Sequence, residues 1–332
     1  MTLTVIAEAG VNHNGDEDLA HTLIDVAVEA GADAVKFQTF EPSKLTSSHA
    51  RTAAYQADRS DAADQTELLS SLTLPEKAWA GLRDHAREAG ITFFSTPFDL
   101  DSARMLVDLG VSALKVSSGE LTNLPFLRAL AAMDVPLLVS TGMGDAVEVA
   151  AAVEACAGAP SLTLFHCVSS YPAPIDQANL RAIPAMREAH GVPVGWSDHT
   201  IGSTSAIAAV ALGATVLEKH FTTDKSLPGP DHAASAEPAE LAEYIAVTRA
   251  AASALGDGVK RRMPAEEDVA AVARRSWHAA RDLAAGEMLA ESDAVALRPE
   301  LGISPAIALV GARVVRSVAA GDPITAADVE LP

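Results

Sequence analysis

Residues 5–10 read VIAEAG and residues 34–40 read AVKFQTF, two short runs rich in β-forming side chains that each end in polar residues. Between them, LAHTLIDVAVEAG at 19–31 spaces its apolar side chains three and four residues apart and closes on a glycine. That spacing predicts an amphipathic helix. A strand, a helix and a second strand in this order predict a parallel βαβ unit.

The same alternation continues through the first two-thirds of the chain, as with the helical segment WAGLRDHAREAG that ends at Gly90. The six further strand-like runs are TFFSTP at 92–97, ALKVSS at 113–118, LLVSTG at 137–142, LTLFHCV at 162–168, PVGWSDH at 193–199 and TVLEKHF at 215–221. Eight such units in roughly 255 residues fit a (β/α)8 TIM barrel better than an open doubly wound sheet. No GxGxxG follows the first run to favour a dinucleotide-binding fold.

The last part of the chain has a different pattern, which begins with a polar stretch around GDGVKRRMPAEE. RDLAAGEMLAESDAV from Arg281 and RSVAAGDPITAADVE from Arg316 then align without gaps, as an internal repeat. A duplicated strand-turn unit predicts a small, pseudo-symmetric β domain. We therefore expect a catalytic barrel at 1–255, a linker at 256–275 and a small β-rich domain at 276–332.

Composition narrows the function classes. Of 332 residues 49% are apolar, and 44 acidic against 24 basic residues give a formal net charge of −20. Such a surface repels nucleic acid and anionic membranes, so we expect neither as a partner. No apolar run has the roughly 18 to 20 residues of a membrane span, and MTLTVIAEAG lacks the features of a signal peptide. We expect a cytoplasmic protein whose two cysteines, Cys156 and Cys167, are core thiols.

Every one of the eight runs ends in side chains able to do chemistry, and active sites of TIM barrels assemble at the carboxyl ends of the strands. These side chains are Glu8, Lys36 with Gln38, Thr96, Lys115 with Ser118, Ser140, His166, Ser197 with His199, and Glu218 with His220.

Two inward lysines, Lys36 and Lys115, need anionic partners in so acidic a chain. A substrate phosphate or carboxylate would serve, helped by the neutral hydroxyl donors Thr96, Ser118, Ser140 and Ser197. The alternative is that the lysines pair with carboxylates of the chain itself, namely Glu8, Glu120 or Glu218. A Schiff-base role for a desolvated lysine also stays open.

His199 and His220 end neighbouring runs whose backbones would lie about 4.8 Å apart. Two imidazoles there could share a divalent metal that keeps open positions for a substrate, as a Lewis-acid site requires. In the alternative, both rings are merely hydrogen-bonded at the barrel mouth. Glu8 and Glu120 could act as general acid and base, or could orient a sugar hydroxyl.

The chain resembles the sialic acid synthase family, which comprises N-acetylneuraminate synthases and their legionaminate and pseudaminate relatives. The resemblance covers essentially the whole chain. Its motifs, in order, are IAEAGVNHNG, AVKFQTF, STPFD, KVSSGELTNLP, STGM, HCVSSYPAP, GWSDHTIG, EKHFT and PGPDH. The tail, with RPELGISP, resembles the antifreeze-like SAF domain that these enzymes carry.

This resemblance implies a TIM barrel followed by an SAF domain, in a domain-swapped homodimer whose small domain closes the partner's barrel. It implies condensation of phosphoenolpyruvate with N-acetylmannosamine or a related amino hexose, with release of phosphate by C–O cleavage. A legionaminate- or pseudaminate-type synthase would instead use a diacetamido-trideoxyhexose. The implied cofactor is a divalent metal, Mn²⁺ in the first place, with Mg²⁺ or Co²⁺ as alternatives.

The resemblance also assigns roles to residues. His199 and His220 would hold the metal. The residues implied around phosphoenolpyruvate are Lys36, Thr96, Lys115, Ser118, Ser140 and Ser197. Those implied around the amino sugar are Glu8, Gln38, Tyr171, Asp231 and, from the partner's tail, Arg298. Glu120 would act near the reacting carbon and the attacking water, with Glu8 and Lys115 as further catalytic residues.

Two departures from the family pattern bear on the identity of the sugar. Ser169 stands where many relatives have asparagine after the HC motif. The long loop from Glu41 to Leu74, of a length typical of lids and binding loops, lacks an asparagine where some relatives contact the N-acetyl group.

Three rival functions remain. Octulosonate or heptulosonate phosphate synthases would need additional cations for the acceptor's phosphate. A Schiff-base aldolase would use Lys115 or Lys219. A non-catalytic carbohydrate-binding or ice-binding protein would account for the tail and leave the strand ends unexplained.

Overall fold

The computed structural model of the chain describes residues 3–46 and 65–332. It divides into two compact units, Met1–Gly256 and Asp257–Pro332, and each is described here by itself. The division falls close to the end of the predicted barrel at residue 255.

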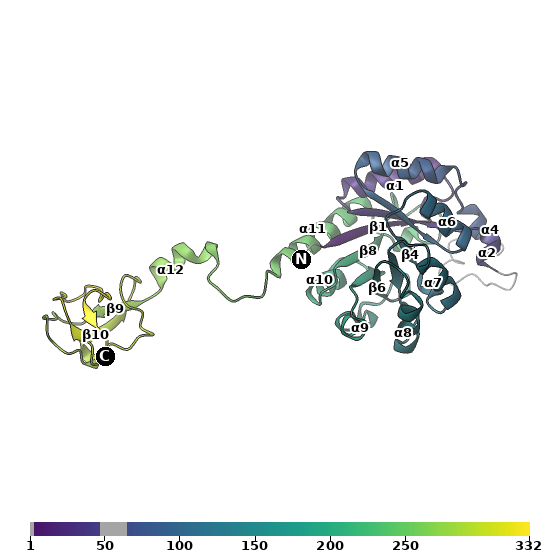
Figure 1. The fold of residues 1–332 in the computed structure, drawn as a ribbon. Helices are drawn as coiled ribbons and strands as arrows, with labels where there is room; N and C mark the ends of the chain where they lie inside the picture. Colours follow the sequence, from purple (N-terminus) through teal and green to yellow (C-terminus); the bar gives the residue numbers. More distant parts are fainter. Residues whose placement is uncertain (1–2, 47–64) are drawn as a thin grey trace. The chain divides into compact units, whose positions relative to one another are not determined.

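The first unit is a closed barrel of parallel strands in chain order, ringed by helices (Figure 1). All eight predicted runs form strands, so the predicted TIM barrel is confirmed. The strands are β1 (Thr4–Gly10), β2 (Ala34–Thr39), β3 (Thr92–Pro97), β4 (Leu114–Val116), β5 (Leu137–Ser140), β6 (Leu162–Cys167), β7 (Val194–Asp198) and β8 (Val216–His220). β8 pairs with β1 and closes the barrel, with Glu8 opposite His220.

Helices cover the barrel, and some of them begin or end at capping residues. The helices are α1 (Glu17–Glu29), α5 (Ala78–Ala89), α6 (Leu100–Asp108), α7 (Leu124–Ala131), α8 (Ala146–Ala155), α9 (Ala182–His190), α10 (Thr204–Ala211) and α11 (Pro238–Ala254). The Asp16 carboxylate accepts hydrogen bonds from the free N–H groups of Asp18 and Leu19 at the start of α1. Gly90 ends α5 in the left-handed conformation, with φ 79°.

The alternation of side chains along each strand separates the core from the site. In β2, Phe37 points outward and packs on Trp79 of α5 and on Phe93 of β3, with ring centroids 6.2 and 5.8 Å apart. Its neighbours Lys36 and Gln38 point to the other side and line the cavity at the carboxyl end. The outward apolar side chains pack against the helices, and the polar side chains that alternate with them are thereby directed into the cavity.

The described parts of the long second connection contain the short helices α2 (Pro42–Leu45) and α4 (Gln65–Ser71). Val11, Phe40, Leu68 and Leu72 form a small apolar cluster of their own beneath it. Most of the stretch in which the sequence analysis looked for an asparagine lies outside the described residues.

The second unit begins with the short helix α12 (Glu267–Ala273), inside the stretch that the sequence analysis treats as a linker. Its strands form two antiparallel pairs, β9 (Ser276–Ala279) with β10 (Ala294–Leu297) and β11 (Arg313–Val314) with β12 (Val329–Glu330).

The internal repeat is visible as two equivalent turns of this unit. Arg281 bonds to Asp293 and Arg316 bonds to Asp328, both at 2.8 Å. The two copies join at Leu283 and Val318, whose backbones exchange hydrogen bonds of 2.9 and 3.0 Å. The predicted small pseudo-symmetric β domain is therefore present.

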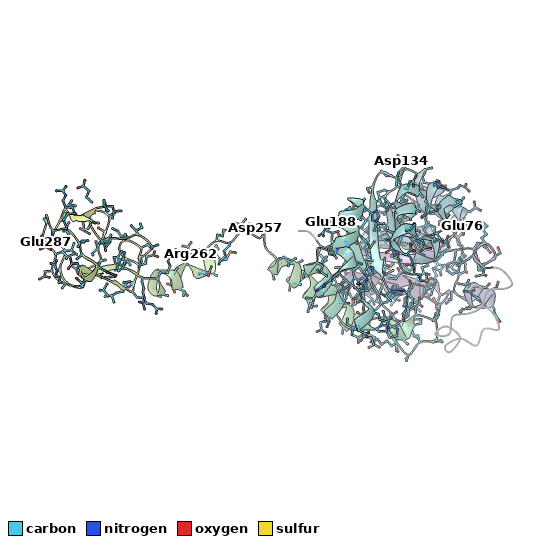
Figure 2. The ribbon with its side chains drawn as sticks, turned by 90° about the horizontal axis from the view of Figure 1, so that it is seen from below. Glu76, Asp134, Glu188, Asp257, Arg262 and Glu287 are labelled. Carbon is cyan, nitrogen blue, oxygen red and sulfur yellow. The ribbon has the colours of Figure 1, made fainter. Side chains whose placement is uncertain are left out.

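Charged side chains such as Glu76, Asp134 and Glu188 project from the outside of the barrel unit (Figure 2). Glu287 projects in the same way from the second unit. Across the described part of the chain, no helix is both long enough and apolar enough to span a membrane.

Candidate active site

A polar cavity of about 470 Å³ lies at the carboxyl ends of the barrel strands. It gathers eleven of the residues that the sequence analysis singled out. They are Glu8, Lys36, Gln38, Thr96, Lys115, Ser118, Ser140, Tyr171, Ser197, His199 and His220.

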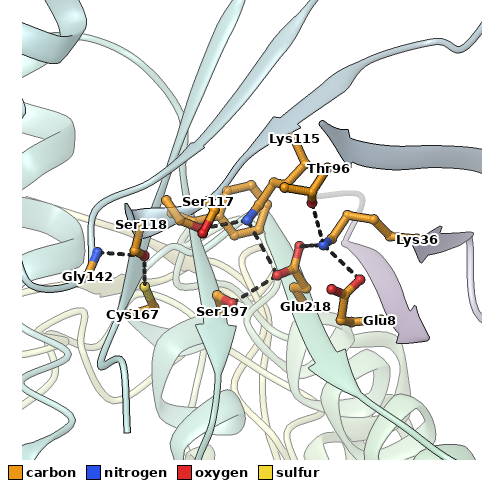
Figure 3. A network of polar contacts seen from close by, with 12 residues as sticks. Glu8, Lys36, Thr96, Lys115, Ser117, Ser118, Gly142, Cys167, Ser197 and Glu218 are labelled. Carbon is orange, nitrogen blue, oxygen red and sulfur yellow. Dashed lines mark hydrogen bonds and ion pairs between the residues drawn. The ribbon is translucent and has the colours of Figure 1, made fainter. Parts of the chain in front are cut away.

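Lys36 is buried at the centre of an ionic network in this cavity (Figure 3). Its Nζ lies 2.7 Å from Glu8 Oε2 and 3.8 Å from Glu218 Oε2, and it donates a hydrogen bond of 2.9 Å to Thr96 Oγ1. Gln38 donates to the other oxygen of Glu8 at 3.1 Å. Glu8 is thus held by an ammonium and an amide at once.

Lys115 reaches the same network from β4 (Figure 3). Its Nζ donates to Ser140 Oγ at 2.6 Å and lies 3.4 Å from Glu218 Oε1, which also accepts from Ser197 Oγ at 3.0 Å. The structure therefore realises the alternative in which the lysines pair with carboxylates of the chain. Both pairs nevertheless face the cavity, so a bound anion can approach the ammonium groups.

The two carboxylates of the network have opposite pKa shifts. Burial alone would raise the pKa of Glu218, but Lys115 and Lys36 outweigh it and hold that pKa at about 2. Burial raises the pKa of Glu8 to about 7, against the attraction of Lys36 and with a further contribution from Glu218. At neutral pH Glu218 is a fixed negative charge, whereas Glu8 can gain or lose a proton.

His199 and His220 lie side by side, with ring centroids 5.6 Å apart. Burial lowers the pKa of His199 to about 4 and the pKa of His220 well below its usual value, so both rings are neutral at pH 7. Nδ1–H of His199 donates to the Val168 carbonyl at 2.8 Å, which leaves the lone pair on Nε2. Nδ1 of His220 is buried without a hydrogen-bond partner.

Tyr171 covers this histidine pair. Its ring lies against His199 at a centroid distance of 4.2 Å, tilted by 35°, and meets His220 edge-on at 5.7 Å. Asp231 follows on the far side, with a carboxylate oxygen 4.0 Å from His220 Nδ1. Burial raises the pKa of Asp231 to about 6.

Three predicted site residues do not line this cavity, and the first, Asp231, lines a smaller recess beside it. Glu120 ends the 3-10 turn Ser118–Glu120, where its carboxylate turns back to accept a hydrogen bond of 2.7 Å from Asn123. Arg298 lies in the second unit, where it follows β10 and its side chain is exposed.

One strand end was read with the wrong side chain. His166 of β6 points away from the cavity, against the Ala178 carbonyl at 2.9 Å and the Trp196 ring. Its neighbour Cys167 points inward and contacts Ser118 Oγ at 3.1 Å. The alternation along the strand, counted from buried Phe165, carries the signal that distinguishes them.

Glu218, predicted only as a strand-end residue and a possible partner of the lysines, bridges both of them. It stands two positions before His220 on β8, so the two side chains must face the same way. The same alternation turns Lys219 outward, where its ammonium lies over the Tyr244 ring of α11 at 5.3 Å. Of the two lysines considered for a Schiff base, Lys115 alone lies in the cavity.

The fold and the site together define a class of protein. A closed parallel barrel with a polar, ion-paired cavity at the carboxyl ends of its strands is the architecture of the TIM-barrel enzymes. Comparison with known proteins then identifies the family. The NeuB family matches residues 23–260 and the SAF domain matches residues 274–330. The chain belongs to the NeuB family, and its relatives are sialic, legionaminic and pseudaminic acid synthases.

Individual relatives agree with this assignment over most of their length. The N,N'-diacetyllegionaminic acid synthase of Legionella pneumophila is 43% identical, over 97% of this chain and 93% of the relative. The pseudaminic acid synthase of Helicobacter pylori is 33% identical, over 98% and 97%. The crystal structure of the N-acetylneuraminic acid synthetase of Leptospira borgpetersenii matches with a TM-score of 0.73 at 34% identity, over 81% of this chain and 90% of that chain.

Proposed function

We propose that this enzyme condenses phosphoenolpyruvate with an open-chain amino hexose to form a nonulosonic acid. The observation that carries the proposal is the convergence of Lys36, Lys115 and a ring of hydroxyl groups on one cavity beside two neutral histidines. Cations and hydroxyls suit an anionic enol substrate, and the histidines suit the carbonyl end of the acceptor.

The ionic network explains how an anion is accommodated. With both lysines and both glutamates charged, the network is neutral. Protonation of Glu8, whose pKa is about 7, leaves one net positive charge facing the ligand. Burial lowers the pKa of Lys115, but the ionised Glu218 opposes that shift and favours the ammonium form, which supports an anion-binding role for Lys115 over a Schiff base. The serine and threonine hydroxyls then donate to the phosphate and carboxylate.

The reaction balances without a further reagent. C3 of phosphoenolpyruvate forms a bond to the aldehyde carbon, water adds to C2, and phosphate leaves as the C2–O bond breaks. Lys36, Lys115 and the hydroxyls hold the enol substrate, and Gln38, Tyr171 and Asp231 would hold the sugar. Holding both reactants in line lowers the barrier by several kcal/mol, up to about 7–11 in the best cases.

We propose His199 and His220 as the ligands of a divalent metal, Mn²⁺ or alternatively Mg²⁺ or Co²⁺. The unpartnered Nδ1 of His220 and the Nε2 lone pair of His199, whose one hydrogen-bond contact is a long one of 3.4 Å to Ser197 Oγ, fit this role. No cluster of three or more candidate ligands occurs in residues 3–46 and 65–332, so substrate and water would complete the coordination. When bound, the metal supplies Lewis acidity at the acceptor's carbonyl oxygen.

The acceptor we propose is 2,4-diacetamido-2,4,6-trideoxymannose, with N-acetylmannosamine as the alternative. The identity to a legionaminic acid synthase, 43%, is higher than that to the N-acetylneuraminic acid synthetase, 34%, or to the pseudaminic acid synthase, 33%, which supports this branch.

Phosphate release from phosphoenolpyruvate tests the proposed function. Each of the two acceptors is supplied with Mn²⁺ and, separately, with EDTA. We expect release that depends on both acceptor and metal, and no inactivation by borohydride. Metal-independent release that borohydride abolishes would instead indicate a Schiff-base aldolase. No release with either sugar would contradict the proposal.

We also propose that the protein is a domain-swapped homodimer in which Arg298 completes the partner's site. The match of residues 274–330 to the SAF domain supports it. His199→Ala and Arg298→Ala should each be inactive alone. Mixed after unfolding and refolding together, they should regain up to about a quarter of wild-type activity, since one hybrid site holds both groups. Absence of recovery would contradict the swap.

A further inference from the structure

A second recess, of about 250 Å³, opens beside the sugar end of the active-site cavity. Gln38, Tyr171 and His220 line both spaces. A molecule held by these residues therefore reaches the recess without crossing a wall of the protein.

The recess is apolar where it leaves the main cavity. Its apolar walls away from that cavity are Val11, Phe40, Leu45, Leu68, Leu69, Leu72 and Pro230. The opening that it shares with the main cavity also has the polar side chains Gln65 and Ser117, beside Phe98. Among the described residues that line the recess alone, Asp231 is the single polar side chain, and it lies against His220 at the polar end.

These walls are part of a packed cluster. Val11, Phe40, Leu68 and Leu72 are each 4 to 7% exposed and pack together as a core of their own. Phe98 meets Phe40 edge-on with a centroid distance of 6.0 Å. The recess is thus a preformed apolar space rather than a gap between mobile side chains.

We propose that this recess receives a methyl-bearing substituent of the acceptor sugar, and that it makes the enzyme selective for acylated deoxyhexoses. The inference rests on the proposed function, because it concerns the acceptor of that reaction. A hydroxymethyl group placed against these walls would lose its water without gaining a hydrogen-bond partner, whereas a methyl group loses nothing.

Two groups of the proposed acceptor carry a suitable methyl, C6 of the deoxy sugar and the acetamido group at C4. Two analogues separate them: 2,4-diacetamido-2,4-dideoxymannose restores the C6 hydroxyl, and 2-acetamido-2,6-dideoxymannose lacks the C4 acetamide. The analogue that loses the group seated in the recess should show kcat/KM lower by roughly 10- to 100-fold.

Substitution of Leu69 tests whether the recess causes the preference. Leu69 is half-buried on α4, and Leu69→Asn has nearly the same size but a polar end. We expect Leu69→Asn to reduce the preference for the full acceptor over the sensitive analogue by about tenfold, since the polar end no longer favours the methyl. Leu69→Met, which keeps the wall apolar, is the matched control and should retain the preference.

The outcomes separate the two proposals. Phosphate release with the full acceptor, together with an unchanged preference in a folded Leu69→Asn enzyme, would overturn the recess and leave the proposed function intact. Equal kcat/KM of the wild type for all three sugars would also overturn the recess and leave the proposed function intact. Failure of every sugar to release phosphate would overturn the proposed function, and the inference about the recess with it.

Discussion

Glu218→Gln should destabilise the barrel by about 3–5 kcal/mol, because it leaves the ammonium of Lys115 buried without a counter-ion. Lys36 retains Glu8 at 2.7 Å, so the uncompensated charge falls on Lys115. The amide has a single acceptor oxygen, which cannot serve Ser197 and both lysines as the carboxylate does, so the Lys115 side chain shifts. A shift of about 1 Å there costs roughly 100-fold in rate, so we expect kcat/KM for phosphoenolpyruvate to fall at least that much.

The loss of stability in Glu218→Gln should become smaller as the pH rises. Burial lowers the pKa of Lys115, and Glu218 opposes that shift in the wild type. Without Glu218 the pKa of Lys115 in the folded protein falls further. In the unfolded chain the pKa of the same lysine is about 10.4. Between these two values the unfolded chain binds one more proton than the folded chain. Stability then rises with pH across that range. Urea unfolding at pH 7 and pH 9 measures the effect.

Glu240→Gln is the matched control for Glu218→Gln. Glu240 pairs with Lys225 at the surface, where both side chains are more than a third exposed, so its loss should cost less than about 1 kcal/mol. Equal, small changes in the two variants would contradict the assignment of Glu218 as the shared counter-ion.

The barrel could be predicted because each strand combines local and tertiary signals. Phe37 and Trp196 must be buried against helices, and the polar residue next to each must then face the barrel interior. The periodic helices with glycine ends, such as α5 with Gly90, supply the other half of the pattern. These signals depend on neighbours in the chain, so the sequence alone carries them.

The site was harder to predict, since it depends on contacts between strands. Which carboxylate each lysine meets is set by strand order and register, which bring Glu218 of β8 within reach of Lys115 of β4 across the barrel. Strand alternation would have shown that His166 faces outward. It would not have shown that Glu120 turns back on Asn123, because a 3-10 turn breaks the alternation.

Gly142 shows how closely the anion-binding side of the cavity is packed. A Cβ at this position would lie 2.3 Å from Ser169 Oγ and 2.8 Å from both Ser118 Oγ and Cys167 Sγ. Its backbone N–H also donates to Ser118 Oγ at 3.0 Å. Three side chains that line the cavity therefore converge on a residue that must lack a side chain.

Gly142→Ala should impair catalysis far more than folding. Gly142 does not have a left-handed φ, so alanine fits its backbone, and serine side chains can rotate away at an overpacking cost of about 1–3 kcal/mol. The rotation moves the Ser118 hydroxyl off its position, and we expect KM for phosphoenolpyruvate to rise and kcat/KM to fall by about 100-fold.

Gly81→Ala on α5 provides the control for Gly142→Ala, because the nearest atom to its added Cβ is His21 Nε2 at 3.9 Å. It should keep full activity and gain up to about 1 kcal/mol from helix propensity. Phosphate-release kinetics measure the effect of both substitutions on catalysis, and thermal unfolding measures their effect on stability. A Gly142→Ala enzyme with wild-type KM and kcat would show that Ser118 does not touch the substrate. A high KM with little change in Tm would instead place the phosphoenolpyruvate site between β4, β5 and β6, where the three side chains meet Gly142.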